Sequence, residues 1–178
     1  ETTSAALRAR TAGLDADNPP QDWDSFMSAC DKLKSSGVQP IGAGVKDGFF
    51  GEWYLVNTLT QNLESPADAL NLFIGNLDWR EPKYHEHWVK LQELKEAGYI
   101  NDDVNSLQLY QGIQLMQTKK AAMALDTTPD IPNNQKQLGA DNVGYFVMPT
   151  FGTGAMAGIP ILDTQGFGIP AKGQNQDV

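Results

Sequence analysis

Two short runs of small and apolar residues, at 38–42 and 121–125, interrupt a chain that otherwise reads mainly as amphipathic helices and polar turns. A compact apolar run bounded by turn residues is typical of a strand that is buried on both faces. Such strands usually lie in parallel sheets, because helices cover both sides of the sheet. The alternation of helices and short strands therefore predicts an α/β fold, with a mostly parallel sheet flanked by helices.

Helical patterns surround the two predicted strands. Asp22 is placed to cap a helix over 23–35, and Gly13 is placed to end a helix over 4–12. Further helices are predicted over 49–63, from Ser65-Pro66 onward, from Glu81-Pro82 to Gly98 and over 105–119; residues 142–147 alternate as a strand, and 158–170 are predicted to be extended. No repeat or flexible linker divides the chain, so we predict that residues 1–178 form a single α/β lobe.

The charge of the chain argues against several classes of partner. It carries 22 acidic and 13 basic residues, a net charge of −9, with no basic run. A nucleic-acid backbone or an anionic membrane surface would be repelled, so neither is an expected partner. No stretch of about 18 apolar residues occurs, and we therefore expect no direct membrane insertion. The single cysteine, Cys30, lies on an apolar helical stripe and is predicted to be a core residue.

Signatures of metal binding and catalysis are weak. The only histidines, His85 and His87, point to different sides of a helix, so we predict no metal site and interpret both as exposed residues beside a buried Trp88. Neither a nucleophile–base motif nor a phosphate-binding glycine loop occurs, and no catalytic residue or cofactor is predicted. Paired carboxylates for glycoside hydrolysis stay open, because the sequence does not give their separations.

Aromatic and polar residues gather directly after the predicted strands. Open α/β sheets bind ligands beyond the carboxyl ends of their strands. Aromatic rings stack on the apolar faces of sugars, while carboxylate, amide and ammonium groups hydrogen-bond sugar hydroxyls. The predicted ligand-binding residues are Lys46, Asp47, Phe49, Phe50 and Trp53 after the first strand, Thr127, Thr128 and Pro129 after the second, and Asp163 and Gln165 in a third polar stretch. The alternatives are that Phe50 and Trp53 belong to the core and that the other two stretches are simple turns.

Four stretches, in this order, resemble the extracellular solute-binding proteins of ABC sugar importers, the maltose-binding-protein-like family. They are Ala12-Gly13-Leu14 with Pro19-Pro20 and Trp23 to Phe26; Ala29 to Ile41; Lys120 to Ala124; and Val147-Met148-Pro149 followed by Gly166 to Ala171. Each motif is short, but together they span nearly the whole chain. The resemblance implies a type II periplasmic-binding-protein fold, in which two α/β lobes close over a ligand about a hinge.

The matching segments correspond to the second lobe of that family. The resemblance implies hinge-crossing segments near 1–6 and 166–178, and we expect a fragment or a processed chain that lacks the first lobe. Two departures stand out. Ser4-Ala5-Ala6 replaces the family's Tyr-Asn-Lys at the first crossing, and a tryptophan that contacts sugar in many members is absent from residues 127–129.

The resemblance also implies a function. The chain would be a substrate-binding component of an ABC transporter, not an enzyme, and would capture a sugar or oligosaccharide by hinge closure. Its partners would be that carbohydrate and the permease subunits of the transporter. Its location would be periplasmic or extracellular, with a lipid anchor on a missing N-terminal segment as one means of tethering. The alternatives are a carboxylate-dependent glycan-processing enzyme and a sensor or scaffold module without a transport role.

Overall fold

The computed structural model describes residues 18–159 and places two strands side by side in a parallel sheet. β1 (Gln39–Gly42) pairs with β2 (Ala121–Ala124), and Ile41 lies opposite Met123. All four residues of β2 are buried, as expected for a strand that is covered on both faces. The prediction of an α/β fold with parallel strands is confirmed, and the described part of the chain contributes two strands to the sheet.

Helices make up most of the remaining regular structure. The α-helices are α1 (Trp23–Ser35), α2 (Phe49–Leu59), α3 (Pro66–Phe73), α4 (Glu86–Glu96), α5 (Leu109–Gln117) and α6 (Ile131–Leu138); short 3-10 helices span Thr60–Asn62, Pro82–Tyr84, Thr128–Asp130 and Ala140–Asn142. The helix predicted over 49–63 is therefore α2 followed by a 3-10 turn. None of the helices within residues 18–159 combines the length and the apolar character needed to cross a bilayer.

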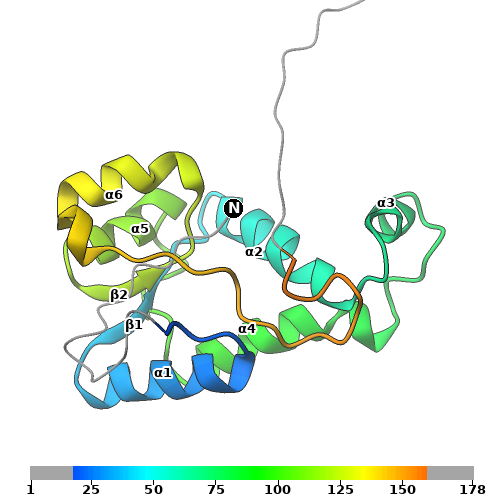
Figure 1. Cartoon of the computed structure of the whole chain (residues 1–178), viewed down its shortest axis with the longest axis horizontal. Coiled ribbons are helices and arrows are strands. Elements are labelled where there is room, and N and C mark those ends of the chain that lie inside the picture. Colours follow the sequence, from blue (N-terminus) through cyan, green and yellow to red (C-terminus); the bar gives the residue numbers. More distant parts are fainter. Residues whose placement is uncertain (1–17, 160–178) are drawn as a thin grey trace, which may run out of the picture.

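The helices cover both faces of the two-stranded sheet. In Figure 1, α1 lies below the strands, and α5 with α6 lies above them. α2 and α4 pack together beside the sheet, while α3 stands at the far end of the molecule (Figure 1). The larger apolar core is built from the sheet, α1, α2, α4 and α5. A smaller core, which includes Leu63, Leu72 and Tyr84, joins the end of α2 to α3.

The first helix forms as the sequence predicts. Asp22 and Ser25 make a capping box, in which the Asp22 side chain accepts a hydrogen bond from the Ser25 amide at 2.8 Å. The buried side of α1 includes Trp23, Phe26 and Cys30, and burial raises the pKa of the Cys30 thiol to about 12. Cys30 is therefore a core residue with an unreactive thiol, as predicted.

Glycine allows the exit of β1 to approach α5 closely. A Cβ atom on Gly112, in the middle of α5, would collide with the main chain of Ala43. A Cβ atom on Gly44 would collide with the carbonyl of Gln108, just before α5. Only glycine fits at such a main-chain contact. This contact holds the first turn of α5 against the segment that leaves β1.

Two predicted elements differ from the structure. Residues 142–147 were expected to form a strand, but only Ala140–Asn142 has regular structure, as a 3-10 turn, and the residues that follow pair with no strand of the described chain. Phe146 nevertheless packs against the core, which accounts for the alternating pattern. The helix predicted over 105–119 begins at Leu109, because the side chain of Gln111 accepts the amide of Gln108 and closes a cap there.

Candidate functional site

The two parallel strands end at the same edge of the sheet. β1 leads into residues 43–48 and then α2, and β2 leads into Leu125, Asp126 and the 3-10 turn Thr128–Asp130. Polar and aromatic residues gather at this edge from both segments, from α2 and from the first turn of α5. We call this set the strand-end rim and define it as Lys46, Asp47, Trp53, Tyr110, Asp126, Thr127, Thr128, Pro129 and Asp130.

Asp47 connects the exit of β1 to α5. Both oxygens of its carboxylate lie 3.2 Å from the amide nitrogen of Leu109, the first residue of that helix. A carboxylate at a helix N-terminus satisfies a free amide and interacts favourably with the helix dipole. The main-chain amide of neighbouring Lys46 donates to the carbonyl of Leu107 at 2.9 Å, while its side chain is exposed. Asp47 thus organises the rim, and its carboxylate keeps lone pairs for another donor.

The three predicted aromatic residues of α2 lie in different surroundings. Phe49 is 52% exposed, whereas Phe50 is buried and stacks on Tyr54 with the ring centroids 6.2 Å apart. Trp53 is half-buried and meets the ring of Tyr110 edge-on, at 6.4 Å and 89°. Phe49 and Trp53 therefore present ring surface outward, while Phe50 serves mainly in packing.

Tyr110 extends the rim beyond the residues that the sequence suggested. Its side chain is 60% exposed, and it comes from the first turn of α5. Partial burial raises the pKa of Tyr110, and the nearby carboxylates of Asp130 and Asp126 raise it further. Tyr110 therefore lies within electrostatic reach of the segment after β2. A helix start that follows a polar turn was the only sequence signal for this residue.

Asp126 is the second rim residue that the sequence analysis missed. It is 1% exposed, and its carboxyl oxygens accept hydrogen bonds from the amide of Thr127 at 2.8 Å and from Asn134 Nδ2 at 2.7 Å. Burial raises its pKa to about 7, and the nearby carboxyl group of Asp130 contributes in the same direction. The side chains of Thr128 and Pro129, next along the chain, are exposed. A polar residue at the end of an apolar strand was the signal for Asp126.

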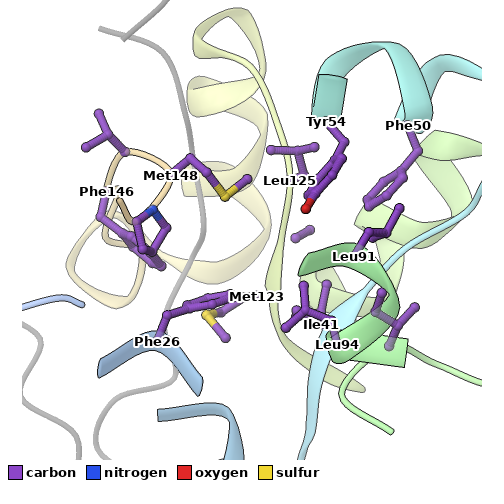
Figure 2. A pocket seen from close by; sticks show the side chains of 14 residues that line it. Phe26, Ile41, Phe50, Tyr54, Leu91, Leu94, Met123, Leu125, Phe146 and Met148 are labelled. Atoms are coloured by element: carbon purple, nitrogen blue, oxygen red, sulfur yellow. The ribbon is translucent and has the colours of Figure 1, made fainter. Parts of the chain in front are cut away.

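An apolar cavity of about 60 Å³ lies behind the rim (Figure 2). Figure 2 shows Phe50 and Tyr54 of α2, Leu91 and Leu94 of α4, and Met123 and Leu125 at the end of β2 around it, with Phe26, Phe146 and Met148 closing the other side. The hydroxyl of Tyr54 already donates to the carbonyl of His87 at 2.7 Å. The cavity is too small for a sugar ring and lacks convergent polar groups, so it is not the ligand site.

The interpretation of the two histidines and Trp88 was wrong for two of the three residues. His87 is 1% exposed, whereas Trp88 is 44% exposed; only His85 is exposed as expected. His87 is buried where α4 packs on α2, and its main-chain carbonyl accepts the hydroxyl of Tyr54. Its Nε2 atom has no hydrogen-bond partner in the described structure, and burial lowers the pKa of the imidazole to about 4.

Several predictions lie outside the described residues. Asp163 and Gln165, the helix over 4–12 and the hinge-crossing segments near 1–6 and 166–178 are among them, and most of the extended segment 158–170 is as well. Of the three polar stretches, the structure therefore brings the first two to one edge and does not place the third. Within residues 18–159, no group of three or more His, Cys, Asp or Glu side chains is arranged to hold a metal ion.

Comparison with solved structures defines the class of fold. A chitin oligosaccharide binding protein aligns with 85% of this chain and 39% of its own length, at a TM-score of 0.72 and 27% identity. A sugar transporter protein from Bacillus licheniformis, solved in complex with stachyose, aligns with 88% of this chain and 41% of its own at a TM-score of 0.63. The chain has a mixed α/β fold whose structural neighbours are type II periplasmic binding proteins.

Sequence comparison gives the family. The bacterial extracellular solute-binding protein family matches residues 5–178, and the chain belongs to it. Among curated proteins, the sn-glycerol-3-phosphate-binding periplasmic protein UgpB of Shigella dysenteriae is 26% identical over 147 residues, which are 79% of this chain and 31% of UgpB. The same protein from Escherichia coli K12 matches over the same extent. The chain thus spans about a third of the length of these curated relatives.

Proposed function

We propose that the chain is the ligand-contacting lobe of the substrate-binding component of an ABC transporter, and that it captures a sugar or oligosaccharide at the strand-end rim. The observation that carries the proposal is the edge-on pair of half-buried Trp53 and exposed Tyr110 at the strand-end rim, where Tyr110 lies within electrostatic reach of the segment that carries Thr127–Pro129. Membership of an extracellular solute-binding family supports the transport role. Capture would end with a second lobe closing over the rim about a hinge.

The chemistry of the rim suits a neutral polyhydroxylated ligand. The rings of Trp53 and Tyr110 offer apolar surface to the C–H face of a sugar. The hydroxyls of Thr127 and Thr128 and the free lone pairs of Asp47 can hydrogen-bond its hydroxyl groups. Asp47, Asp126 and Asp130 contribute three carboxyl groups to the rim, whereas Lys46 contributes its one ammonium group. This balance favours a neutral sugar over a phosphate ester as the ligand of this lobe.

We propose binding without turnover. Glycoside hydrolysis needs two carboxyl groups that face a substrate in an open cleft. Asp126 is buried, and its oxygens already accept hydrogen bonds from Thr127 and Asn134. The solved relatives with this fold include binding proteins for chitin oligosaccharide and stachyose. We place the protein in the periplasm or outside the cell, as in its family, where the permease subunits of the transporter would be its partner.

The test is an NMR titration of the ¹⁵N-labelled 178-residue chain with stachyose, a chitin oligosaccharide and sn-glycerol 3-phosphate. One lobe supplies only part of the contacts, so we expect millimolar affinity, equivalent to roughly −4 kcal/mol, for one of the two sugars. The Trp53 indole and the amides of Thr127 and Thr128 should shift with the sugar and not with the phosphate.

A matched pair of variants gives the control. Trp53→Ala should weaken sugar binding at least about fivefold, because removal of a stacked ring costs about 1–3 kcal/mol. Trp88→Ala removes another partly exposed tryptophan, which packs on Tyr54 and His87 and lies outside the rim, and should leave the affinity unchanged. Shifts that are absent with both sugars, or that avoid the rim, would overturn the proposed function.

A further inference from the structure

The helix α2 has more apolar surface than its packing uses. Its buried face, which includes Phe50 and Tyr54, packs on the larger core and on α4 (Figure 1). A helix at the surface of a domain usually turns charged and polar side chains to the opposite side. In α2, Glu52 is the only charged residue from Phe49 to Leu59, so apolar side chains stand on the outer face of this helix as well.

Three of these outer residues form one continuous stripe, which we call the α2 stripe: Phe49, Trp53 and Val56. Their spacing is i, i+4 and i+7, so they share one face of the helix. Phe49 is 52% exposed, Val56 is 37% exposed and Trp53 is half-buried. Neither apolar core of the described chain includes Phe49 or Val56. Single exposed apolar residues are ordinary, but a contiguous exposed stripe is typical of a surface that contacts a ligand or a partner.

The α2 stripe is continuous with the strand-end rim. Trp53 belongs to both, and its ring meets that of Tyr110 with the ring planes at 89°. Phe49 follows the rim residue Asp47 by two positions, at the start of α2. The perpendicular rings of Trp53 and Tyr110 form a corner, with Phe49 on one side of it along the helix and Val56 on the other. A ligand that stacks at this corner therefore has further apolar surface on both sides.

The dimensions of the α2 stripe suit a chain of sugar rings. Side chains three or four residues apart on a helix have Cβ atoms about 5–6 Å apart. Neighbouring pyranose rings of an oligosaccharide have a similar spacing. The helix rises about 10 Å from Phe49 to Val56, so more than one ring can lie along it. Glu52 lies on the same side of α2 and is exposed, so its carboxylate can accept hydrogen bonds from sugar hydroxyls.

We propose that the ligand is an oligosaccharide that lies along α2: one sugar ring occupies the corner of Trp53 and Tyr110, and neighbouring rings contact Phe49 and Val56. The inference rests on the proposed function, because it extends the strand-end rim, and it favours a sugar chain over a monosaccharide. Most of the affinity gained from the chain should come from Phe49, since an aromatic ring offers a larger flat face than valine. The alternative is that another part of the protein covers the α2 stripe, and it predicts no dependence on chain length.

The first test compares sugars of different length. The ¹⁵N-labelled 178-residue chain is titrated with galactose and stachyose, and with N-acetylglucosamine and a chitin oligosaccharide. In the pair that binds, the oligosaccharide should bind at least about fivefold more tightly, the usual contribution of one well-packed aromatic contact. The amides of Phe49 and Val56 should shift with the oligosaccharide only, whereas the Trp53 indole should shift with both sugars.

A variant assigns this gain to the α2 stripe. Phe49→Ala should lower the affinity for the oligosaccharide at least about fivefold and leave the shifts caused by the monosaccharide unchanged, because the corner keeps its contacts. The Phe49 side chain is largely exposed, so the variant should fold, and its amide spectrum verifies this. Phe73→Ala, the matched control, removes a similarly exposed phenylalanine from α3 and should change neither sugar.

The outcomes separate the inference from the proposed function. Equal affinity for the two lengths of sugar, or an unchanged oligosaccharide affinity in Phe49→Ala, would overturn the inference and leave sugar capture at the rim intact. Binding of an oligosaccharide through Phe49 without detectable binding of its monosaccharide would support the inference. The absence of binding by all four sugars would overturn the proposed function, and the inference with it.

Discussion

The carboxylate of Asp47 accepts the main-chain amide of Leu109 at 3.2 Å, although 62 residues separate them in the sequence. This hydrogen bond joins the turn after β1 to the first turn of α5, which carries Tyr110. A residue predicted only as a ligand contact therefore also holds the helix that supplies a neighbouring aromatic ring. The position of Tyr110 at the rim depends on it.

Loss of this carboxylate should destabilise the fold. For Asp47→Ala we expect the free energy of unfolding to fall by about 1 kcal/mol, the usual cost of removing a helix-capping acceptor. Asp47→Asn keeps an oxygen acceptor and should cost less than half as much. Urea denaturation followed by circular dichroism measures both, with the exposed Asp141→Ala as control. Equal stability of Asp47→Ala and Asp141→Ala would show that the contact does not support the fold.

The close approach of α5 to the exit of β1 gives a second prediction. Gly112→Ala places a methyl group against the main chain of Ala43 and Gly44 and should cost about 1–3 kcal/mol of stability. Gly51→Ala, in α2, meets no atom within 4 Å and should raise stability by about 0.5–1 kcal/mol. Thermal unfolding of the two variants should move in opposite directions. A neutral Gly112→Ala would contradict the proximity of these two segments.

Buried His87 predicts loss of stability in acid. Burial lowers its pKa from 6.5 to about 4, so the unfolded chain binds a proton more readily across this window. The free energy of unfolding should therefore decrease, by up to about 3 kcal/mol, as the pH falls from 6.5 to 4. Asp126 has the opposite effect on stability, because its pKa is raised in the folded chain. The stability that it contributes is lost as the pH rises from about 4 to 7.

Variants separate the two titrations. His87→Leu should remove the acid-dependent loss of stability. It also removes the buried Nε2 atom that has no hydrogen-bond partner. His85→Leu, on the exposed side, should keep the loss. The measurement is the difference in unfolding free energy between each variant and the parent chain at pH 4.5 and pH 6.5. A parallel pH profile for His87→Leu and the parent would refute the assignment.

The elements whose sequence carries a local signal were the easiest to predict. α1 has a local cap at Asp22 and a regular apolar stripe, and β1 and β2 are short apolar runs, so local chemistry is sufficient there. The segment after Asn142 has the alternating apolar pattern of a strand, but it pairs with no strand of the described chain. An alternating pattern alone does not provide a pairing partner. Periodicity indicates which side chains face the core, not whether the main chain pairs.

The candidate site was predicted only in part, for a similar reason. The rule that ligands lie beyond strand ends located Asp47, Trp53 and Thr127 from sequence. Tyr110 reaches the rim through the contact of Gly112 with Ala43, which is a tertiary contact with no local signature. The exchange of burial between His87 and Trp88 likewise follows from the packing of α4 on α2, since both residues fit the helical pattern equally well.

The most direct test of the account is an intermolecular NOE experiment on the 178-residue chain with stachyose and with the chitin oligosaccharide. If the rim captures sugar, C–H protons of one of these ligands should show NOEs to the ring protons of Trp53 and Tyr110. NOEs confined to another exposed apolar surface, such as Leu70 and Phe73 of α3 with the following Ile74, would contradict the claim that the strand-end rim is where this chain meets its ligand.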